Sequence, residues 1–144
     1  MIYISSDHGG FALKNYLIKT FRDKGIDLED LGPKELDTGD DYPDFAINLA
    51  KKVAENQENK GILICRNGVG MSVVANRFKG VRAALSWGPQ HAKSSRNDDD
   101  SNILALPADY LSEIEAVNTT EAWLITPFSG EERMKRRLEK LKSL

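Results

Sequence analysis

The sequence has almost no cysteine: Cys65 is the only one among 144 residues. A single thiol excludes an intrachain disulfide framework and any zinc site built from several cysteines. The chain also lacks an excess of basic residues, since 20 Lys and Arg stand against 22 Asp and Glu, for a net charge of −2. Binding to nucleic acid or to an anionic membrane needs a large positive field, so neither is predicted as a partner.

Long apolar runs are missing as well. No uninterrupted stretch reaches the roughly 20 residues of a membrane-spanning helix, and the sequence does not open with a basic and apolar leader. We therefore expect a soluble, cytoplasmic protein. The composition is that of a globular domain, with 40% hydrophobic and 29% charged residues. No repeat, linker or low-complexity tract divides the chain, so residues 1–144 are predicted to form one domain.

Short apolar runs alternate with helical periods along the chain. Strands are expected at 2–4, 26–31, 62–64, 81–85 and 103–106. Helices are expected between them and after the last strand, at about 11–24, 43–53, 73–75, 89–97 and 111–124, with a charged helix at 130–144. Five short strands that alternate with helices predict an α/β fold with a doubly wound, mainly parallel sheet.

Two groups of polar residues follow the first and third predicted strands. Asp7 and His8 lie in the segment SDHGG after the first, and Cys65 opens the segment CRNGVG after the third. In an open parallel sheet, ligands bind beyond the carboxyl ends of the strands. Both groups lie at that edge, so Asp7, His8 and Cys65 are predicted to converge although they are far apart in the sequence.

The segment CRNGVGMS at 65–72 has the strongest chemical pattern. Gly68 and Gly70 allow backbone N–H groups to approach an anion, and the helix start behind them adds partial positive charge. The same field would favour the thiolate of Cys65. The spacing excludes a cysteine phosphatase loop, because Met71 stands where an arginine is needed, and the segment has neither a dinucleotide-binding glycine pattern nor a Walker lysine. The alternative is a buried strand-end thiol followed by a simple turn.

The remaining candidates each have a structural alternative. Asp7 and His8 either cap a helix or belong to the site. The run from Asn97 to Asp100 lacks the ligand spacing of a calcium loop and is interpreted as a solvated acidic loop, so no metal is predicted. His91 is expected on the surface, and Trp87 and Trp123 in packing positions.

The charged helix at 130–144 also has two interpretations. It is either an exposed helix held by salt bridges, or it presents Arg133 and Arg137, one turn apart on the same face, to a phosphate.

Several segments together resemble the ribose-5-phosphate isomerase B family, which includes the galactose-6-phosphate isomerase subunits. They are SDHGGFALK at 6–14, DYPDFA at 41–46, GILICRNGVGMSVVANRFKGVRAAL at 61–85, DSNILAL at 100–106 and ERMKRR at 132–137. The resemblance implies a Rossmann-like fold, here a single domain with a doubly wound sheet of five mainly parallel strands flanked by helices. It also implies a homodimer or homotetramer in which the neighbouring subunit completes each site, with no metal and no organic cofactor.

The resemblance implies an aldose–ketose isomerase that acts on a sugar phosphate, ribose 5-phosphate in the simplest case, through an enediol or enediolate. Cys65 matches the cysteine base of the family. The amides of Asn67, Gly68, Val69 and Gly70 would stabilise the enediolate. Asp7 and Tyr42 match positions of the family that contact sugar hydroxyls. The positions that bind the phosphate in the family are matched by His8, Arg133 and Arg137.

The chain departs from the family pattern at several of these positions. Arg66 and Asn67 replace a Gly and a Thr, Asp98 and Asp99 stand in place of a His-Asn pair, and Asp109 replaces a phosphate-binding arginine. We expect either Asp98 or His91 to open the sugar ring in place of the missing histidine, Asp99 to contact substrate, and Arg66 to supply the cation lost at Asp109. The departures leave two alternatives open, an isomerase of a hexose 6-phosphate and a silent sugar-phosphate-binding subunit.

Overall fold

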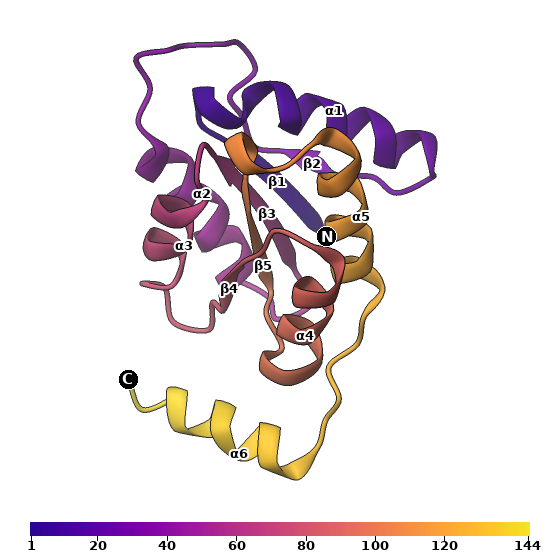
Figure 1. Ribbon diagram of the computed structural model, residues 1–144. Helices are drawn as coiled ribbons and strands as arrows, with labels where there is room; N and C mark the ends of the chain where they lie inside the picture. The colour runs from indigo at the N-terminus through magenta and orange to yellow at the C-terminus, as the bar shows by residue number, and fades with distance from the viewer.

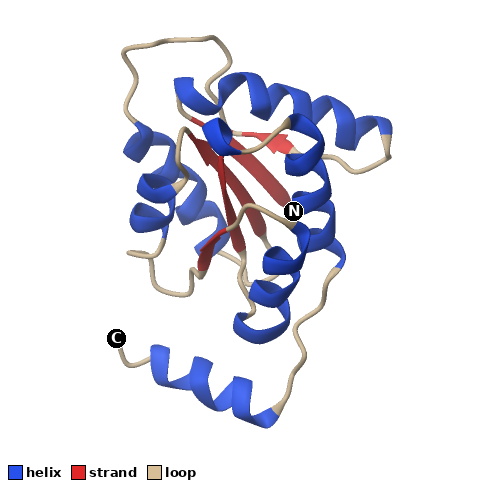
Figure 2. Ribbon diagram, in the orientation of Figure 1, coloured by secondary structure: helices blue, strands red, loops and turns tan.

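A five-stranded sheet runs through the centre of the molecule (Figures 1 and 2). The computed structural model describes residues 1–144. The strands are β1 (Ile2–Ser6), β2 (Glu29–Asp30), β3 (Lys60–Cys65), β4 (Ala83–Leu85) and β5 (Ile103–Pro107). They lie in the order β2-β1-β3-β5-β4, and every neighbouring pair is parallel. The predicted α/β fold with a doubly wound sheet is confirmed, and the sheet is entirely parallel.

Helices cover both faces of the sheet, as Figure 1 shows. They are α1 (Phe11–Asp23), α2 (Tyr42–Ala54), α3 (Val69–Ala75), α4 (Pro89–Asp99), α5 (Glu113–Ile125) and α6 (Glu132–Leu141), with the short 3-10 turns η1 (His8–Gly10) and η2 (Ala108–Tyr110). Helices α1, α4 and α5 pack on one face, whereas α2 and α3 pack on the other. None of these helices combines the length and the hydropathy needed to cross a membrane.

The alternation of side chains along β3 builds the two halves of the core. Ile62 and Ile64 point to the face that α1, α4 and α5 cover, and Leu63 and Cys65 point to the face that α2 and α3 cover. All four side chains are at most 4% exposed. A strand that is buried on both faces has a continuous run of apolar residues, and the run at 62–64 predicts this strand correctly.

The two edge strands are shorter than predicted. Of the predicted strand at 26–31, only Glu29 and Asp30 pair with β1, and of the one at 81–85 only Ala83–Leu85 pair with β5. Each edge strand has one partner, and short edge strands limit the unpaired backbone that a sheet presents to other chains.

The interpretation of Asn97 to Asp100 as an acidic loop is wrong. Asn97, Asp98 and Asp99 form the last turn of α4, and Asp100 ends the helix with φ of 46°. The carboxylate of Asp100 accepts hydrogen bonds from Arg82 at 3.0 Å and from Arg96 at 2.8 Å. The two guanidinium groups thus pair with Asp100 alone, Arg96 from one turn earlier in the same helix and Arg82 from the segment before β4.

The two tryptophans differ in their surroundings. Trp123 is fully buried, as predicted, and its indole N–H donates to the hydroxyl of Ser101 at 2.9 Å. The packing prediction is wrong for Trp87, which is 58% exposed and stacks on His91 with ring centroids 4.4 Å apart. Trp87 follows the short edge strand β4, where no neighbouring element covers it.

A buried lysine fixes the start of the loop between β2 and α2. The side chain of Lys14 is fully buried in α1, and its ammonium group donates to Asp30 Oδ1 and to the carbonyl of Pro33, both at 2.8 Å. Partial burial raises the pKa of Asp30, but hydrogen bonds from Lys14 and from the Gly32 amide outweigh this effect, so the pKa lies below its ordinary value. The pair therefore tethers the loop to the sheet.

Removing Asp30 is expected to destabilise the protein because the Lys14 ammonium would remain buried without its partner. Breaking one side of a buried ion pair costs about 3–5 kcal/mol. We expect Asp30→Ala to lower the free energy of unfolding in urea by about 3 kcal/mol, and Lys14→Met to cost less, because Asp30 stays partly exposed and hydrogen-bonded. Asp23→Ala breaks the exposed pair with Lys19 and is the control, expected within about 0.5 kcal/mol of wild type. Equal losses in the Asp30 and Asp23 variants would contradict a structural role for the buried pair.

Candidate active site

A pocket of about 200 Å³ opens beyond the carboxyl ends of β1 and β3. Its lining combines residues that follow both strands with the start of α2: Asp7, His8, Tyr42, Cys65, Arg66, Asn67 and Gly70. The two strands are neighbours in the sheet, and the helices that follow them, α1 and α3, pack on opposite faces. A crevice at such a switch point is where open α/β sheets bind ligands. The predicted convergence of Asp7, His8 and Cys65 is confirmed.

Cys65 is the last residue of β3 and contributes its sulfur to the pocket wall. The residue is 4% exposed, so it belongs to the core and to the pocket at once. The amide of Gly68 donates to Sγ at 3.1 Å, and the Asn67 side-chain oxygen lies 3.9 Å from the same sulfur. These contacts hold the sulfur at the end of the strand, next to the turn at 66–68.

Close contacts explain why glycine stands at positions 68 and 70, shortly after Cys65 in the sequence. Gly68 has φ of 72°, and a Cβ atom there would lie 2.4 Å from Leu85 Cδ1. A Cβ atom on Gly70 would lie 2.6 Å from Cζ of Tyr42, so the Tyr42 ring packs directly over the Gly70 backbone. A side chain at position 70 would displace the Tyr42 ring, which lines the pocket, whereas one at position 68 would collide with Leu85.

The amides of this turn are only partly available to a ligand. Gly68 N–H is bonded to Cys65 Sγ, and Val69 N–H donates to Asn67 Oδ1 at 3.0 Å. Val69 is 45% exposed and does not line the pocket, whereas Asn67 and Gly70 do. Of the four predicted amides, those of Asn67 and Gly70 therefore belong to residues that face the pocket.

Asp7 caps the first turn after β1 and also lines the pocket. Its Oδ1 accepts a hydrogen bond from the Gly10 amide at 3.2 Å at the start of η1. Burial raises the pKa of Asp7 above its ordinary value, although amide hydrogen bonds from Gly10 and Gly9 and the charge of His8 oppose the rise.

His8 is held by a carboxylate that the sequence analysis missed. Nδ1 of His8 lies 2.6 Å from Oδ1 of Asp40, and the same oxygen accepts the backbone N–H of His8 at 3.0 Å. This hydrogen bond is the main cause that raises the pKa of His8 above its ordinary value, with a further contribution from the charge of Asp7. Asp40 lies in an irregular loop that has no periodicity, and its only signal is an acidic pair directly before α2.

Arg66 and Asp109 form an ion pair beside the pocket. Nη1 of Arg66 lies 3.6 Å from Oδ2 of Asp109, and the Asp109 amide donates to the Arg66 carbonyl at 2.9 Å. Both side chains are about half exposed or more, so the pair remains accessible. The structure thus places the Arg66 cation at the pocket, next to the position where the sequence analysis noted a lost arginine.

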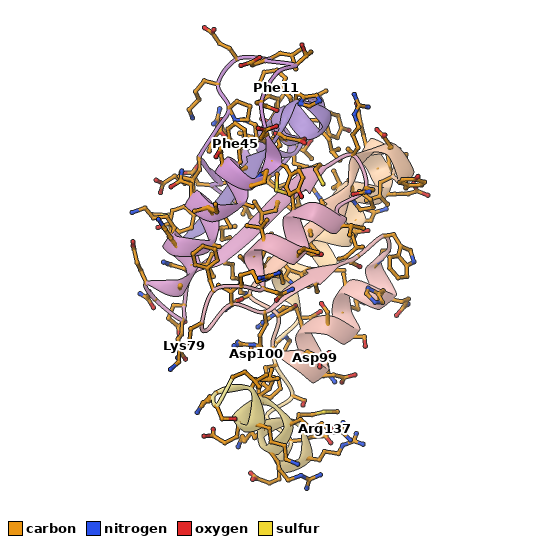
Figure 3. The ribbon with its side chains drawn as sticks, turned by 90° about the vertical axis from the view of Figure 1, so that its left-hand side faces the viewer. Phe11, Phe45, Lys79, Asp99, Asp100 and Arg137 are labelled. Atoms are coloured by element: carbon orange, nitrogen blue, oxygen red, sulfur yellow. The ribbon has the colours of Figure 1, made fainter.

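The other predicted site residues lie elsewhere in the chain. The pocket lining does not include Asp98 or Asp99 of α4, nor Arg133 or Arg137 of α6. Figure 3 shows Asp99 and Arg137 at the end of the molecule opposite Phe11 and Phe45. Both arginines are exposed, and Arg133 donates to Glu131 at 2.9 Å. One chain alone does not bring these residues to Cys65.

One cluster of residues has the donor types of a metal site. Asp7, His8 and Asp40 offer ligand atoms within 4.8 Å of one another. Hydrogen bonds join His8 to Asp40 and the Gly10 amide to Asp7, so these donors are engaged with one another and with the backbone.

The chain is similar to a described family and to several curated proteins. The model of the family described as Ribose/Galactose Isomerase matches residues 2–141. A protein named probable ribose-5-phosphate isomerase B from Mycoplasma pneumoniae is 41% identical over 135 residues, which cover 94% of this chain and 89% of that protein. The ribose-5-phosphate isomerase B of Escherichia coli is 35% identical, with 90% and 86% of the two chains covered.

Solved structures show the same similarity. The crystal structure of ribose-5-phosphate isomerase B from Mycoplasma genitalium with bound ribulose-5-phosphate superimposes with a TM-score of 0.94 at 38% identity, covering 99% of this chain and 93% of that one. The corresponding enzyme from Thermotoga maritima gives a TM-score of 0.94 at 38% identity, with 99% and 97% covered.

Proposed function

The chain belongs to the ribose/galactose isomerase family and is an aldose–ketose isomerase of the ribose-5-phosphate isomerase B type, and we propose that it interconverts ribose 5-phosphate and ribulose 5-phosphate. The observation that carries this proposal is Cys65: a thiol at the wall of a small polar pocket, with an amide hydrogen bond to its sulfur. We also propose that this activity is cytoplasmic.

The proposed reaction moves one proton between two neighbouring carbons. In the open-chain aldose, the Cys65 thiolate takes the proton from C2, and the electrons of that bond form the C1–C2 double bond of an enediolate with the charge on O1. The proton of the C2 hydroxyl then passes to O1, which becomes the C1 hydroxyl, while the thiol returns its proton to C1 and C2 becomes the carbonyl carbon. A group near the reacting carbons must stabilise the negative oxygen, and we assign this role to the amides of Asn67 and Gly70.

The remaining pocket residues fit the two ends of the substrate. Asp7 and Tyr42 would bind the sugar hydroxyls, because a carboxylate accepts and a phenol both donates and accepts hydrogen bonds. His8 and Arg66 supply positive charge for the phosphate. The phosphate lies away from the reacting carbons, and its binding orients the small sugar for the proton transfer. The binding energy of the phosphate thereby accelerates that step.

We propose that the working protein is a homodimer, alone or within a homotetramer, with sites shared between subunits. The second copy would bring its Arg133 and Arg137 to the phosphate and its Asp98 and Asp99 to the sugar, with Asp98 acting in ring opening. Two observations support this. All four residues lie away from the pocket of their own chain, and α6 extends from the body of the domain with its arginines exposed (Figure 1).

The substrate is tested with the purified protein and a panel of aldose phosphates of five and six carbons. We expect kcat/KM to be highest for ribose 5-phosphate, because the relatives described above are named for the isomerisation of this sugar phosphate. One extra carbon in a pocket of fixed size changes kcat/KM by about 10-fold or more. Highest turnover of a hexose 6-phosphate would replace the proposed substrate with a larger one. Binding of sugar phosphates without turnover of any of them would contradict the proposed reaction.

A further inference from the structure

A buried carboxylate in this structure has a single residue as its partner. The side chain of Asp40 is 9% exposed, and both of its hydrogen bonds come from His8, one from Nδ1 and one from the backbone amide. Its second oxygen, Oδ2, is buried and has no hydrogen-bond partner. A desolvated carboxylate needs a compensating charge, and His8 is the cationic side chain in contact with it.

The contact orients the His8 ring and favours its protonated form. A carboxylate can only accept hydrogen bonds, so the proton of this 2.6 Å contact is on Nδ1. The other ring nitrogen, Nε2, is then free for the pocket that His8 lines. A distance this short is typical of a charge-assisted hydrogen bond, in which the imidazole is an imidazolium.

We propose that Asp40 is a positioning residue for phosphate binding: it holds His8 as an oriented imidazolium whose Nε2–H donates to the phosphate of the substrate. This inference rests on the proposed function, since it names what binds at the His8 end of the pocket. It adds a residue from the loop before α2 to a site that is otherwise built at the ends of β1 and β3 and at the start of α2.

Other charged groups around His8 do not replace Asp40. Asp7 is the second carboxylate near the ring and also favours the protonated form, but it accepts its hydrogen bond from the Gly10 amide. Arg66 disfavours a positive charge on His8, and its own charge is partly neutralised by Asp109. Asp40 is therefore the group whose removal most changes the charge of the ring.

The test compares Asp40→Asn with Asp41→Asn. Asparagine at position 40 keeps an oxygen that can accept from His8 but removes the negative charge. Asp41 is exposed, its side chain makes no hydrogen bond, and it lies directly beside Asp40, so the same substitution there is a matched control. We expect Asp40→Asn to bind ribose 5-phosphate more weakly as the pH rises. At pH 8, its KM should exceed that of the wild-type protein by about tenfold for each unit by which the pKa of His8 falls. The kcat of the variant should stay within about twofold of wild type.

The sign of the pH effect follows from the direction of the shift. The raised pKa of His8 keeps the ring charged to a higher pH in the wild-type protein. In Asp40→Asn, KM should therefore begin to rise at lower pH than in wild type, and the two proteins should converge near pH 5, where the ring is protonated in both. A loss of affinity that is the same at all pH values would show that Asp40 only maintains the shape of the loop, and would overturn the proposal.

A second measurement does not depend on turnover. The chain has two histidines, so NMR titration of the imidazole signals separates His8 from His91. We expect the pKa of His8 to fall in Asp40→Asn, to stay unchanged in Asp41→Asn, and the His8 signals of the wild-type protein to respond to inorganic phosphate. If the titration and the phosphate response are as expected but no sugar phosphate is converted, the proposed reaction fails and the role of Asp40 stands. If the pKa of His8 is the same in wild type and Asp40→Asn, the role of Asp40 fails whatever the activity.

Discussion

Replacement of Cys65 by serine is expected to lower kcat for sugar-phosphate isomerisation by about a thousandfold, within the range of general acid–base catalysis. A serine hydroxyl is nearly isosteric with the thiol but does not ionise at neutral pH, so it cannot remove the C2 proton. The measurement is steady-state turnover of ribose 5-phosphate, together with solvent exchange of the C2 proton, which isolates the proton transfer from the later steps.

The control for this prediction is substrate binding. Cys65 forms the wall of the pocket but is not assigned to the phosphate, so KM or the dissociation constant should change by less than about threefold in the serine variant. Cys65→Ala should be equally inactive, because it also lacks a base. Serine or alanine variants that retain a tenth or more of wild-type turnover would exclude Cys65 as the base and would leave the other pocket residues to supply it.

Mixing two inactive variants is expected to restore activity if sites are shared between subunits. One variant is Cys65→Ala, and the other is the double variant Arg133→Ala/Arg137→Ala, assayed at substrate concentrations below KM. Each shared site combines Cys65 of one chain with Arg133 and Arg137 of the other. In a heterodimer, one site therefore contains both sets of changes, and the other site contains neither. Random reassociation of equal amounts gives half heterodimers, each with one intact site of two, so about a quarter of wild-type activity should return.

A second mixture makes this test specific. Cys65→Ala and Asp7→Ala change two residues that line the same pocket of the same chain. Each site of their heterodimer therefore keeps one defect, and no activity should return. Failure of the arginine variant to complement Cys65→Ala, after exchange of subunits has been verified by mass spectrometry, would show that α6 serves the pocket of its own chain or none.

Much of the fold follows from local signals. Gly25 ends α1 with φ of 79°, and Pro43 lies in the first turn of α2, so both helix boundaries could be read from residue types. The apolar run at 62–64 has the pattern of a strand buried on both faces. The convergence of Asp7 and Cys65 needed one further rule, that the carboxyl ends of parallel strands meet at one edge of the sheet.

The site is less completely predictable because some of its geometry is set by tertiary contacts. Asp40 reaches His8 from an irregular loop, and the start of that loop is held by Lys14, a lysine that hydropathy would place on the surface. No pattern in the loop itself indicates either contact. Asp100 shows the same limit, since its role depends on two arginines that approach from different elements.

The residues assigned to a second copy show a different limit. The helix that carries Arg133 and Arg137 was predicted with the correct character, and α6 spans Glu132–Leu141. The place that we propose for this helix in the site would be a property of an assembly, and within one chain the helix lies at the far end of the domain. A resemblance between sequences can suggest such a role, whereas hydropathy and spacing within one chain cannot.

The sulfur of Cys65 is part of the hydrophobic layer between the sheet and the helices α2 and α3, where it shares one cluster with Leu63, Met71 and Ala75. These apolar neighbours set the position of the sulfur that we propose as the base. Since a displacement of about 1 Å can cost a hundredfold in rate, a change of side-chain volume around Cys65 is expected to slow the proposed reaction while the fold persists. The packing of the interior thus fixes the place of one atom as well as the stability of the domain.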